Sequence, residues 1–355
     1  MKEMSARPDF VVATGDYLEE WMTEQDVSGA ELARRLGVSR KHVSELLSGK
    51  ATLSQAVSIA LSDVTGVPAR IWNLYESAYR EELARRAAAD RYVAQHDEAS
   101  QFPLKYLREL GVITANSRDK AGTVRELLDF FGVASIDAWR RTWSEGSVAY
   151  RRTTVDRDDA REIAVWLTIA ERETARRDVS PYDAAALRAL LPTLRALTAA
   201  ELPSSIASAV ELLARVGVAL CFVPPVPGLG VYGATRWMGG TPILQLSLLR
   251  KTDDQLWFTL FHEIGHVLLH GDDHQLHLGD DGSDAELEAN QFASDLLIPR
   301  EFLDRLPLTR NIGAVEELAK ELGIAPSIVL GRAQREMKDF AWGHKLKRKL
   351  NFASA

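Results

Sequence analysis

Two histidines four residues apart frame a glutamate in the segment HEIGH, as His262, Glu263 and His266. On a helix, residues four apart lie on one face about one turn from each other, so both imidazoles can reach a single metal ion. Glu263 would then lie beside a water on that metal and could accept its proton. The pattern therefore predicts a zinc site with hydrolytic chemistry, although five residues of this kind also occur by chance.

The surrounding segment predicts one buried helix over about 253–270. Thr252 and Gln255 fit a capping box at its start. The helix is apolar enough to be buried, and buried histidines need polar partners. The alternative interpretation is a pair of core histidines with satisfied hydrogen bonds and no metal. The apolar positions are Phe258, Phe261, Val267 and Leu268.

A tetrahedral zinc site needs a third protein ligand and an open position for water. If DAELEANQFASDLLIP is a helix, Glu286, Ala289 and Ala293 share a face, and the small alanines let that face approach the histidine helix closely. Glu286 is therefore favoured as the third ligand over Glu288, which lies on a different face. Asn290 is predicted to bind the far nitrogen of a ligand histidine and so to orient it.

Three further histidines follow in the chain, at positions 270, 274 and 277. One straight helix rarely offers three ligands to one ion, so we do not expect His270 to be a ligand. His274 and His277 lie in an acidic loop, where a solvated histidine is the ordinary outcome. The metzincin class is excluded, because Leu269 and Asp272 occupy the positions where its pattern requires glycine and histidine.

A second chemical pattern lies near the amino terminus, in SGAELARRLGVSRKHVSELLSGK. Ser28 with Glu31 predicts the start of one helix, Gly37 permits the sharp turn that ends it, and Ser39 can cap the next helix. Side chains near the amino end of that second helix could contact base edges and phosphates in the major groove. The candidates for DNA contact are Ser39, Arg40, Lys41, His42, Ser44, Glu45 and Lys50.

The local charge supports this interpretation. Residues 28–50 hold five Lys or Arg against two Glu, whereas the whole chain has a net charge of −7. The preceding segment, 16–27, has five acidic residues and no basic one. Nucleic-acid binding must therefore come from a local basic face. The alternative is a helical hairpin whose charged face is simply solvated.

The elements that must position these residues predict a mainly α, multidomain chain. Strands at about 217–223, 230–237 and 241–248 should form a small antiparallel sheet before the histidine helix. The expected parts are an all-α helix-turn-helix domain at 12–88, a helical middle region at 89–200, an α+β domain at 201–340 and a basic tail at 341–355. We expect that tail to be solvated, although it could touch DNA phosphates.

The cysteine content and the distribution of apolar residues indicate the cellular location that we expect. Cys221 is the one cysteine of the 355 residues, so a disulfide framework within the chain is excluded. The start, MKEMSARPDF, lacks the apolar core of a signal peptide, and no apolar run reaches the roughly 18 residues that span a bilayer. We therefore expect a cytoplasmic protein with no membrane partner.

HEIGHVLLH followed by ELEANQFASDLLIP resembles the ImmA/IrrE family of zinc-dependent peptidases, a branch similar to the thermolysin-like gluzincins. The gluzincin pattern of Glu, three residues, then Asp or Asn corresponds to Glu286 and Asn290. Residues 15–80 resemble phage-repressor-like helix-turn-helix proteins and, among them, HigA-type antitoxin repressors. AELARRLGVSRKHVSELLSGK and GVPARIWNLYESAY carry that second resemblance.

The first resemblance implies a minimal zincin-like metallopeptidase domain that binds one Zn²⁺, with Mn²⁺ as the alternative, on His262, His266 and Glu286. Glu263 would be the catalytic base, and an edge strand of the sheet would receive the substrate. Tyr232 and Arg236, on the predicted hairpin, are the candidate oxyanion partners; the alternative for each is a purely structural role.

Together the two resemblances imply a regulator that binds a double-stranded DNA operator, as a homodimer, and cleaves a regulatory protein of repressor or antitoxin type. Such cleavage would belong to a stress, phage or toxin-antitoxin response. The alternative is a HigA-like antitoxin or repressor whose metallopeptidase-like domain senses a ligand or binds a partner toxin without routine proteolysis.

Overall fold

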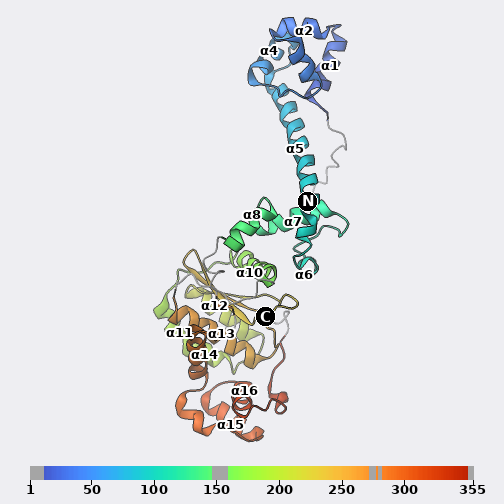
Figure 1. The fold of residues 1–355 in the computed structure, drawn as a ribbon. Helices are drawn as coiled ribbons and strands as arrows, with labels where there is room; N and C mark the ends of the chain where they lie inside the picture. Colours follow the sequence, from blue (N-terminus) through green and yellow to red (C-terminus); the bar gives the residue numbers. More distant parts are fainter. Residues whose placement is uncertain (1–11, 146–158, 272–276, 279–281, 351–355) are drawn as a thin grey trace. The chain divides into compact units, whose positions relative to one another are not determined.

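The computed structural model describes residues 12–145, 159–271, 277–278 and 282–350. The chain divides into two compact units. The first comprises the described residues up to His96 together with 118–124, and the second comprises 97–117 and the described residues from 125 onward. Helices dominate both units (Figure 1), which confirms the predicted mainly α, multidomain class. No helix of the described ranges is both long and apolar enough to cross a bilayer.

The first unit is a cluster of helices around a small apolar core. Its elements are α1 (Thr14–Glu24), α2 (Gly29–Leu36), α3 (Arg40–Leu47), α4 (Gln55–Thr65) and the first part of α5 (Ala69–Ala99). Their apolar faces meet in a core that includes Leu18, Leu32, Val43, Leu61 and Trp72. This arrangement follows from the helical spacing of apolar residues, because each helix has one face to bury.

The predicted turn between α2 and α3 is confirmed. The Ser28 hydroxyl accepts a hydrogen bond from the Glu31 amide at 3.2 Å, and the Ser39 hydroxyl accepts one from the His42 amide at 3.1 Å. Gly37 has a φ of 70°, in the left-handed region that glycine adopts without strain. The turn at Gly37 and the cap at Ser39 set where α3 begins, and therefore which side chains lie at its amino end.

The last helix of the first unit is longer than predicted. α5 runs for 31 residues, and the domain boundary expected at residue 88 falls inside it. Residues 77–99 contain no glycine or proline, so nothing in their sequence ends the helix. The next proline is Pro103, which immediately precedes α6 (Leu104–Glu109).

The second unit contains a four-stranded sheet with strand order β1-β3-β2-β4. The strands are β1 (Ala219–Phe222), β2 (Gly233–Met238), β3 (Thr241–Leu246) and β4 (His277–Leu278). β2 and β3 form the predicted antiparallel hairpin, turned at Gly239 and Gly240 with φ values of 57° and 85°. The prediction of a wholly antiparallel sheet is wrong, because β1 pairs with β3 in parallel. The segment after β1 crosses to the far side of β3 before β2 begins, so β1 and β3 run in the same direction.

Helices of the second unit lie on both faces of this sheet (Figure 1). α7 (Lys120–Phe131) belongs partly to each unit. The short elements of the second unit are α6, α8 (Ile136–Arg140), the π-helical turn at Arg141–Glu145, and the 3-10 turns at Arg300–Arg305 and His344–Leu346. The remaining helices are α10 (Ala160–Thr174), α11 (Ala184–Leu197), α12 (Ser204–Arg215), α13 (Asp253–Leu269), α14 (Asp284–Leu297), α15 (Ile312–Leu322) and α16 (Pro326–Met337).

Two helices that we expected in a separate middle region belong to the core of the second unit. In α10, the Trp166 indole donates to the Val223 carbonyl at 3.2 Å, and the Gln245 amide of β3 donates to the Trp166 carbonyl at 2.8 Å. In α11, Leu187 and Leu194 are fully buried in the same hydrophobic core as α13 and α14. The expected boundary at residue 200 therefore does not separate two cores.

The basic segment near the end of the chain is anchored at the start of α13. The Arg348 guanidinium and backbone amide donate to the two carboxylate oxygens of the fully buried Asp253 at 2.7 and 2.9 Å. The same guanidinium donates to the carbonyls of Thr198 and Ala200 at 2.7 and 2.6 Å. The expectation of a solvated tail is therefore wrong for this segment, which holds the amino end of the histidine helix in place.

Candidate functional site

Three predicted ligand side chains come together in the second unit. One ligand atom from each of His262, His266 and Glu286 lies within 4.8 Å of the other two, and all three residues are buried. The two histidine Nε2 atoms are 3.0 Å apart. The Glu286 carboxylate lies 3.1 Å from His262 Nε2 and 3.2 Å from His266 Nε2. Glu286 thus occupies the place predicted for the third ligand.

The close crossing of α13 and α14 brings these residues together. A Cβ added at Gly265 would lie 3.1 Å from Phe292 Cδ1 and 3.3 Å from Ala289 Cα, so a larger residue would push the helices apart. Ala289 and Ala293 are fully buried at this contact. Ser283 begins α14 by accepting a hydrogen bond from the Glu286 amide at 3.3 Å. Small residues on both helices therefore allow Glu286 to reach the histidines.

The spacing of these atoms fits one metal ion. Ligand atoms around a tetrahedral zinc, with bonds of about 2.0–2.1 Å, lie about 3.3 Å from one another. The observed separations of 3.0, 3.1 and 3.2 Å are close to that value. Two imidazole nitrogens and one carboxylate also form a donor set that zinc accepts in catalytic sites.

The far nitrogens of both histidines have their own hydrogen-bond partners. His262 Nδ1 lies 3.1 Å from the Asn290 side-chain oxygen, the contact predicted for Asn290. His266 Nδ1 lies 3.0 Å from His270 Nδ1, and His270 Nε2 lies 3.2 Å from a Glu288 carboxylate oxygen. With both Nδ1 atoms protonated as donors, each Nε2 keeps its lone pair for a metal.

His270 and Glu288 lie outside the ligand group. His270 supports His266 instead of joining the group, and the Glu288 side chain is 64% exposed. The backbone of His277 pairs in β4, whereas His274 falls outside the described residues. Sequence reasoning missed the supporting role of His270, although its position one turn after His266 places both on one helical face.

In this group, burial and the neighbouring charged or hydrogen-bonding groups shift the pKa values in opposite directions. Burial alone would raise the pKa of Glu286, but the hydrogen bonds that His262 and His266 donate when their Nε2 atoms carry protons lower it to about 2. Burial disfavours the charged form of His262, yet its hydrogen bond to Glu286 and the nearby Glu263 raise its pKa. The carboxylate is thus held ionised next to the two imidazoles, as a metal ligand must be.

The side chain of Glu263 extends from α13 to β2, and the residue is 2% exposed. One carboxylate oxygen accepts a hydrogen bond from the Thr235 hydroxyl at 2.7 Å. A Cβ added at Gly233 would lie 2.3 Å from the other oxygen. Burial raises the pKa of Glu263, against the opposing effect of both histidines and Thr235. The sequence did not identify Gly233 and Thr235 as neighbours of Glu263. The available signal was their spacing, because residues two apart on a strand face the same side of the sheet.

The structure does not bring the candidate oxyanion partners to this group. Arg236 follows Thr235 on β2 and therefore faces the opposite side of the sheet, where its guanidinium donates to the Leu167 carbonyl at 2.5 Å. The Tyr232 hydroxyl accepts a hydrogen bond from Arg250 at 2.9 Å. β2 is not an edge strand of the sheet, because it pairs with β3 on one side and, at Ala234 and Thr235, with β4 on the other.

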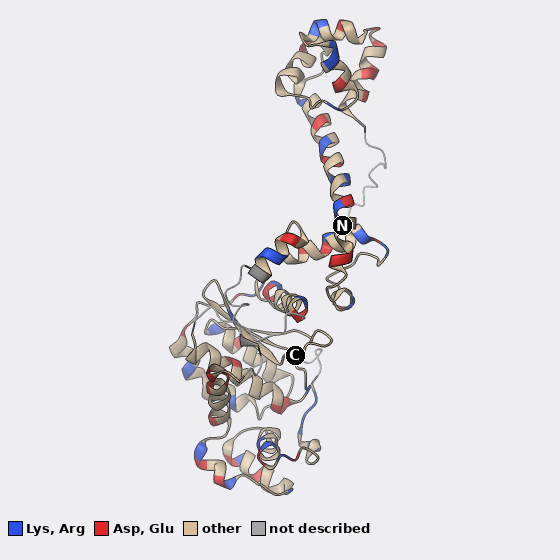
Figure 2. Cartoon of the chain, viewed as in Figure 1, with Lys and Arg blue, Asp and Glu red and all other residues tan. Residues whose placement is uncertain are grey.

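The candidate DNA-contacting residues lie at the start of α3 and along it, except Lys50, which follows its carboxyl end. Ser39, Arg40 and Lys41 are exposed, as are Ser44 and Lys50, whereas His42 and Glu45 are half-buried. Glu45 lies 3.7 Å from the Lys41 ammonium. Acidic residues gather instead along α1 (Figure 2). The basic side chains of α3 are therefore available to a polyanion, and the first unit has an acidic side apart from them.

Family models match one segment in each of the two units. A helix-turn-helix family model matches residues 18–72, and a model described as IrrE N-terminal-like domain, of the M78 peptidase family, matches residues 224–334. The chain is also 35% identical over 65 residues to an uncharacterized HTH-type transcriptional regulator, YddM, of Escherichia coli (strain K12). That match covers 18% of this chain and 69% of the relative. The protein therefore belongs to the helix-turn-helix family of transcriptional regulators and carries, in its second unit, an IrrE-like domain of the M78 peptidase family.

Proposed function

We propose that the protein is a DNA-binding regulator whose second unit is a zinc-dependent endopeptidase that cleaves a regulatory protein. The observation that carries this proposal is the placement of Glu263 beside the His262, His266 and Glu286 group. A metal site that only stabilised the fold would need no buried carboxylate next to its ligands. The membership of the M78 peptidase family supports the same chemistry.

In the proposed peptide hydrolysis, the side chains of the site have different roles. A zinc ion held by His262, His266 and Glu286 would acidify a water and polarise the scissile carbonyl. Glu263 accepts the proton of the attacking water and delivers it to the leaving amine. Burial raises the pKa of Glu263, which brings it nearer to the neutral range where a general base is most effective. Thr235 holds one carboxylate oxygen, which leaves the other for the water.

Metal removal and reloading test the proposal. The full-length protein is stripped with a chelator, reloaded with one equivalent of zinc, and incubated with extract of its source cells lacking the gene. We expect new protein amino termini, detected by terminal-peptide mass spectrometry, only with the zinc-loaded protein. If both preparations leave the same termini, the peptidase proposal is wrong.

The substitution Gly233→Ala should lower cleavage without removing zinc. The added Cβ would lie 2.3 Å from a Glu263 carboxylate oxygen, so Glu263 must move while the ligands stay in place. A displacement of about 1 Å can cost about 100-fold in rate, so we expect a loss of about 10- to 100-fold. Gly230→Ala is the matched control, because nothing lies within 4 Å of its added Cβ. Full activity of Gly233→Ala, with its zinc bound, would contradict the placement of Glu263.

The double substitution Arg40→Ala and Lys41→Ala should weaken DNA binding. Each side chain that neutralises a phosphate contributes about −0.9 to the slope of log affinity against log salt, so losing two contacts should flatten the slope by about 2. The probe is a duplex selected by the wild-type protein from a random-sequence pool. Arg215→Gln, on the exposed side of α12, is the control. An unchanged slope in the double variant would exclude these two residues as phosphate contacts.

A further inference from the structure

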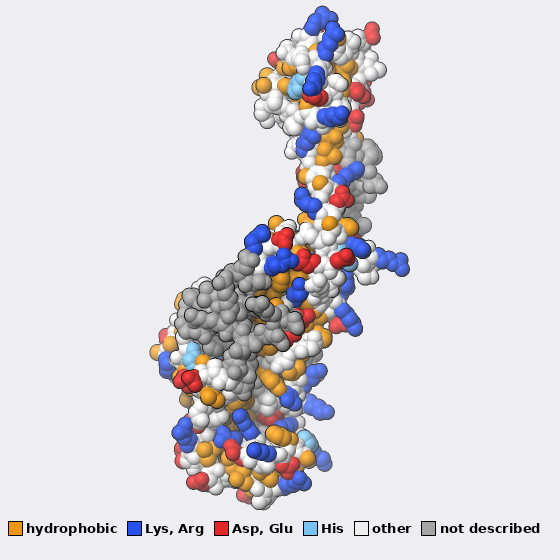
Figure 3. Space-filling model, in the orientation of Figure 1, with side chains coloured by type: hydrophobic (Ala, Val, Ile, Leu, Met, Phe, Trp, Pro, Cys, Tyr) orange, Lys and Arg blue, Asp and Glu red, His pale blue; other side chains and the backbone are white. Residues whose placement is uncertain are grey.

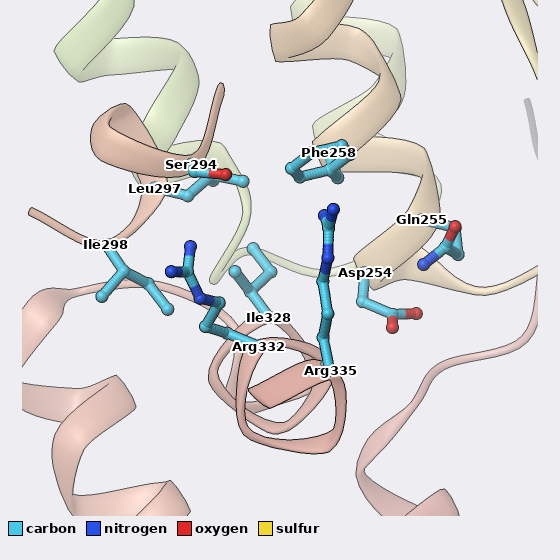
Figure 4. A pocket seen from close by; sticks show the side chains of 10 residues that line it. Asp254, Gln255, Phe258, Ser294, Leu297, Ile298, Ile328, Arg332 and Arg335 are labelled. Carbon is cyan, nitrogen blue, oxygen red and sulfur yellow. The ribbon is translucent and has the colours of Figure 1, made fainter. Parts of the chain in front are cut away.

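A pocket lies where α13, α14 and α16 meet in the second unit (Figure 4). Apolar side chains from all three helices line it, namely Phe258, Leu297, Ile298 and Ile328. The side chains of Arg332 and Arg335 extend from α16 toward Phe258 and Ser294. The pocket therefore combines an apolar lining with two guanidinium groups.

The pocket lies about one helical turn from the candidate metal ligands. Phe258 precedes His262 by four residues on α13, and their ring centroids are 6.5 Å apart. Ser294 follows Asn290 by four residues on α14, and Asn290 contacts His262. Four residues of a helix span about 6 Å, which is about two residues of an extended peptide. A substrate residue about two positions from the scissile bond could therefore reach the pocket.

The charged side chains of the pocket differ in whether the described residues supply them with a partner. Asp254 is buried and lies 2.7 Å from the Lys347 ammonium, and Arg332 donates to Glu336 at 2.8 Å. Arg335 makes no side-chain hydrogen bond or ion pair with the part of the chain that the structure describes. Figure 3 shows Lys and Arg side chains beside hydrophobic ones over the α15 and α16 part of this unit. The pocket thus has an excess positive charge at Arg335.

We propose that this pocket selects the substrate segment next to the scissile bond, a proposal that rests on the peptidase function above. An apolar substrate side chain occupies the space lined by Leu297, Ile298 and Ile328, and a carboxylate two residues along the substrate pairs with Arg335. Side chains two apart in an extended peptide project to the same side, about 6.7 Å from each other. Burial of the apolar side chain and pairing of the carboxylate with Arg335 then both favour binding of the same substrate segment. The favoured substrate is an acidic, partly apolar stretch of a protein.

Peptide binding tests this proposal without relying on hydrolysis. The probes are fluorescein-labelled peptide amides of sequence Ala-Leu-Ala-Glu-Ala-Ala and the versions with Gln or Lys in place of Glu. Fluorescence anisotropy is measured on the zinc-loaded full-length protein in a Glu263→Gln background, so that peptides stay intact. We expect the Glu peptide to bind about fivefold more tightly than the Lys peptide, the upper range of an exposed ion pair. Arg335→Gln should remove this preference and Arg335→Glu should reverse it, whereas Arg215→Gln should leave it unchanged.

Several results would overturn the proposal. They are an unchanged preference in Arg335→Glu, equal binding of a peptide with Ser in place of Leu, and no measurable binding of any peptide. The outcome also separates this proposal from the peptidase function. If the parent protein cleaves nothing but the preference depends on Arg335, the peptidase proposal fails and the pocket stands as a peptide-binding site. If cleavage occurs and Arg335 has no influence on binding or cleavage, the pocket proposal fails alone.

Discussion

Replacing Glu263 with glutamine should abolish cleavage while zinc stays bound. The amide matches the carboxylate in size at a position that is 2% exposed, and its oxygen can still accept the hydrogen bond from Thr235. What it cannot do is take a proton from water, and general-base catalysis contributes about 10²- to 10⁴-fold to a rate. We expect the yield of the zinc-dependent amino termini to fall by that factor. Zinc content, measured by mass spectrometry, should remain near one equivalent.

The same variant distinguishes an enzyme from a binding protein. Carried at the native locus, Glu263→Gln should leave binding to the selected DNA duplex unchanged but prevent any regulation that requires cleavage. Glu317→Gln, an exposed glutamate of α15, is the matched control for loss of one charge. If regulation in cells survives Glu263→Gln, the second unit acts by binding a ligand or a partner such as a toxin, and the peptidase proposal is wrong.

Replacing Glu286 with glutamine should remove the metal. Hydrogen bonds from His262 and His266 hold the pKa of Glu286 at about 2, so its carboxylate is ionised and ready to coordinate. Removing a residue that only supports a ligand costs about 10- to 100-fold in metal affinity, so loss of a ligand should cost at least 100-fold. Competition with a chromophoric zinc chelator measures the affinity, and circular dichroism checks that the helices remain.

Glu288→Gln is the control for this loss, because Glu288 reaches the group only through His270. Its carboxylate lies 3.2 Å from His270 Nε2, and the side chain is 64% exposed. We therefore expect zinc affinity to fall by about tenfold or less. A greater loss in Glu288→Gln than in Glu286→Gln would reverse the assignment of the third ligand.

Much of the candidate site could be predicted from local sequence patterns. The placement of His262 and His266 on one face follows from helical periodicity, and so does the choice of Glu286 over Glu288 on the next helix. The structure brings these three residues into one group, and local patterns were enough to choose them among the candidates. The caps at Ser28 and Ser39 were also predictable, because a cap involves residues only three apart.

Features that depend on distant segments could not be predicted in this way. The parallel pairing of β1 with β3 depends on where the chain crosses the sheet, and residue alternation within a strand does not reveal that. The assignment of α10 and α11 to the second unit depends on contacts such as Trp166 with Val223, 57 residues apart. The attachment of Arg348 to Asp253 joins residues 95 apart, so a basic run alone predicted only a solvated tail.

Residue type and helical period are local properties, so the amino-acid sequence is enough to tell which chemical groups are present and which face of each helix carries them. How those groups are held depends on the packing of distant segments. Gly233 and Thr235 place Glu263, His270 and Glu288 orient His266, and Arg348 anchors the start of α13. Each of these contacts joins separate elements or depends on side-chain positions set by packing, and packing reflects the whole fold.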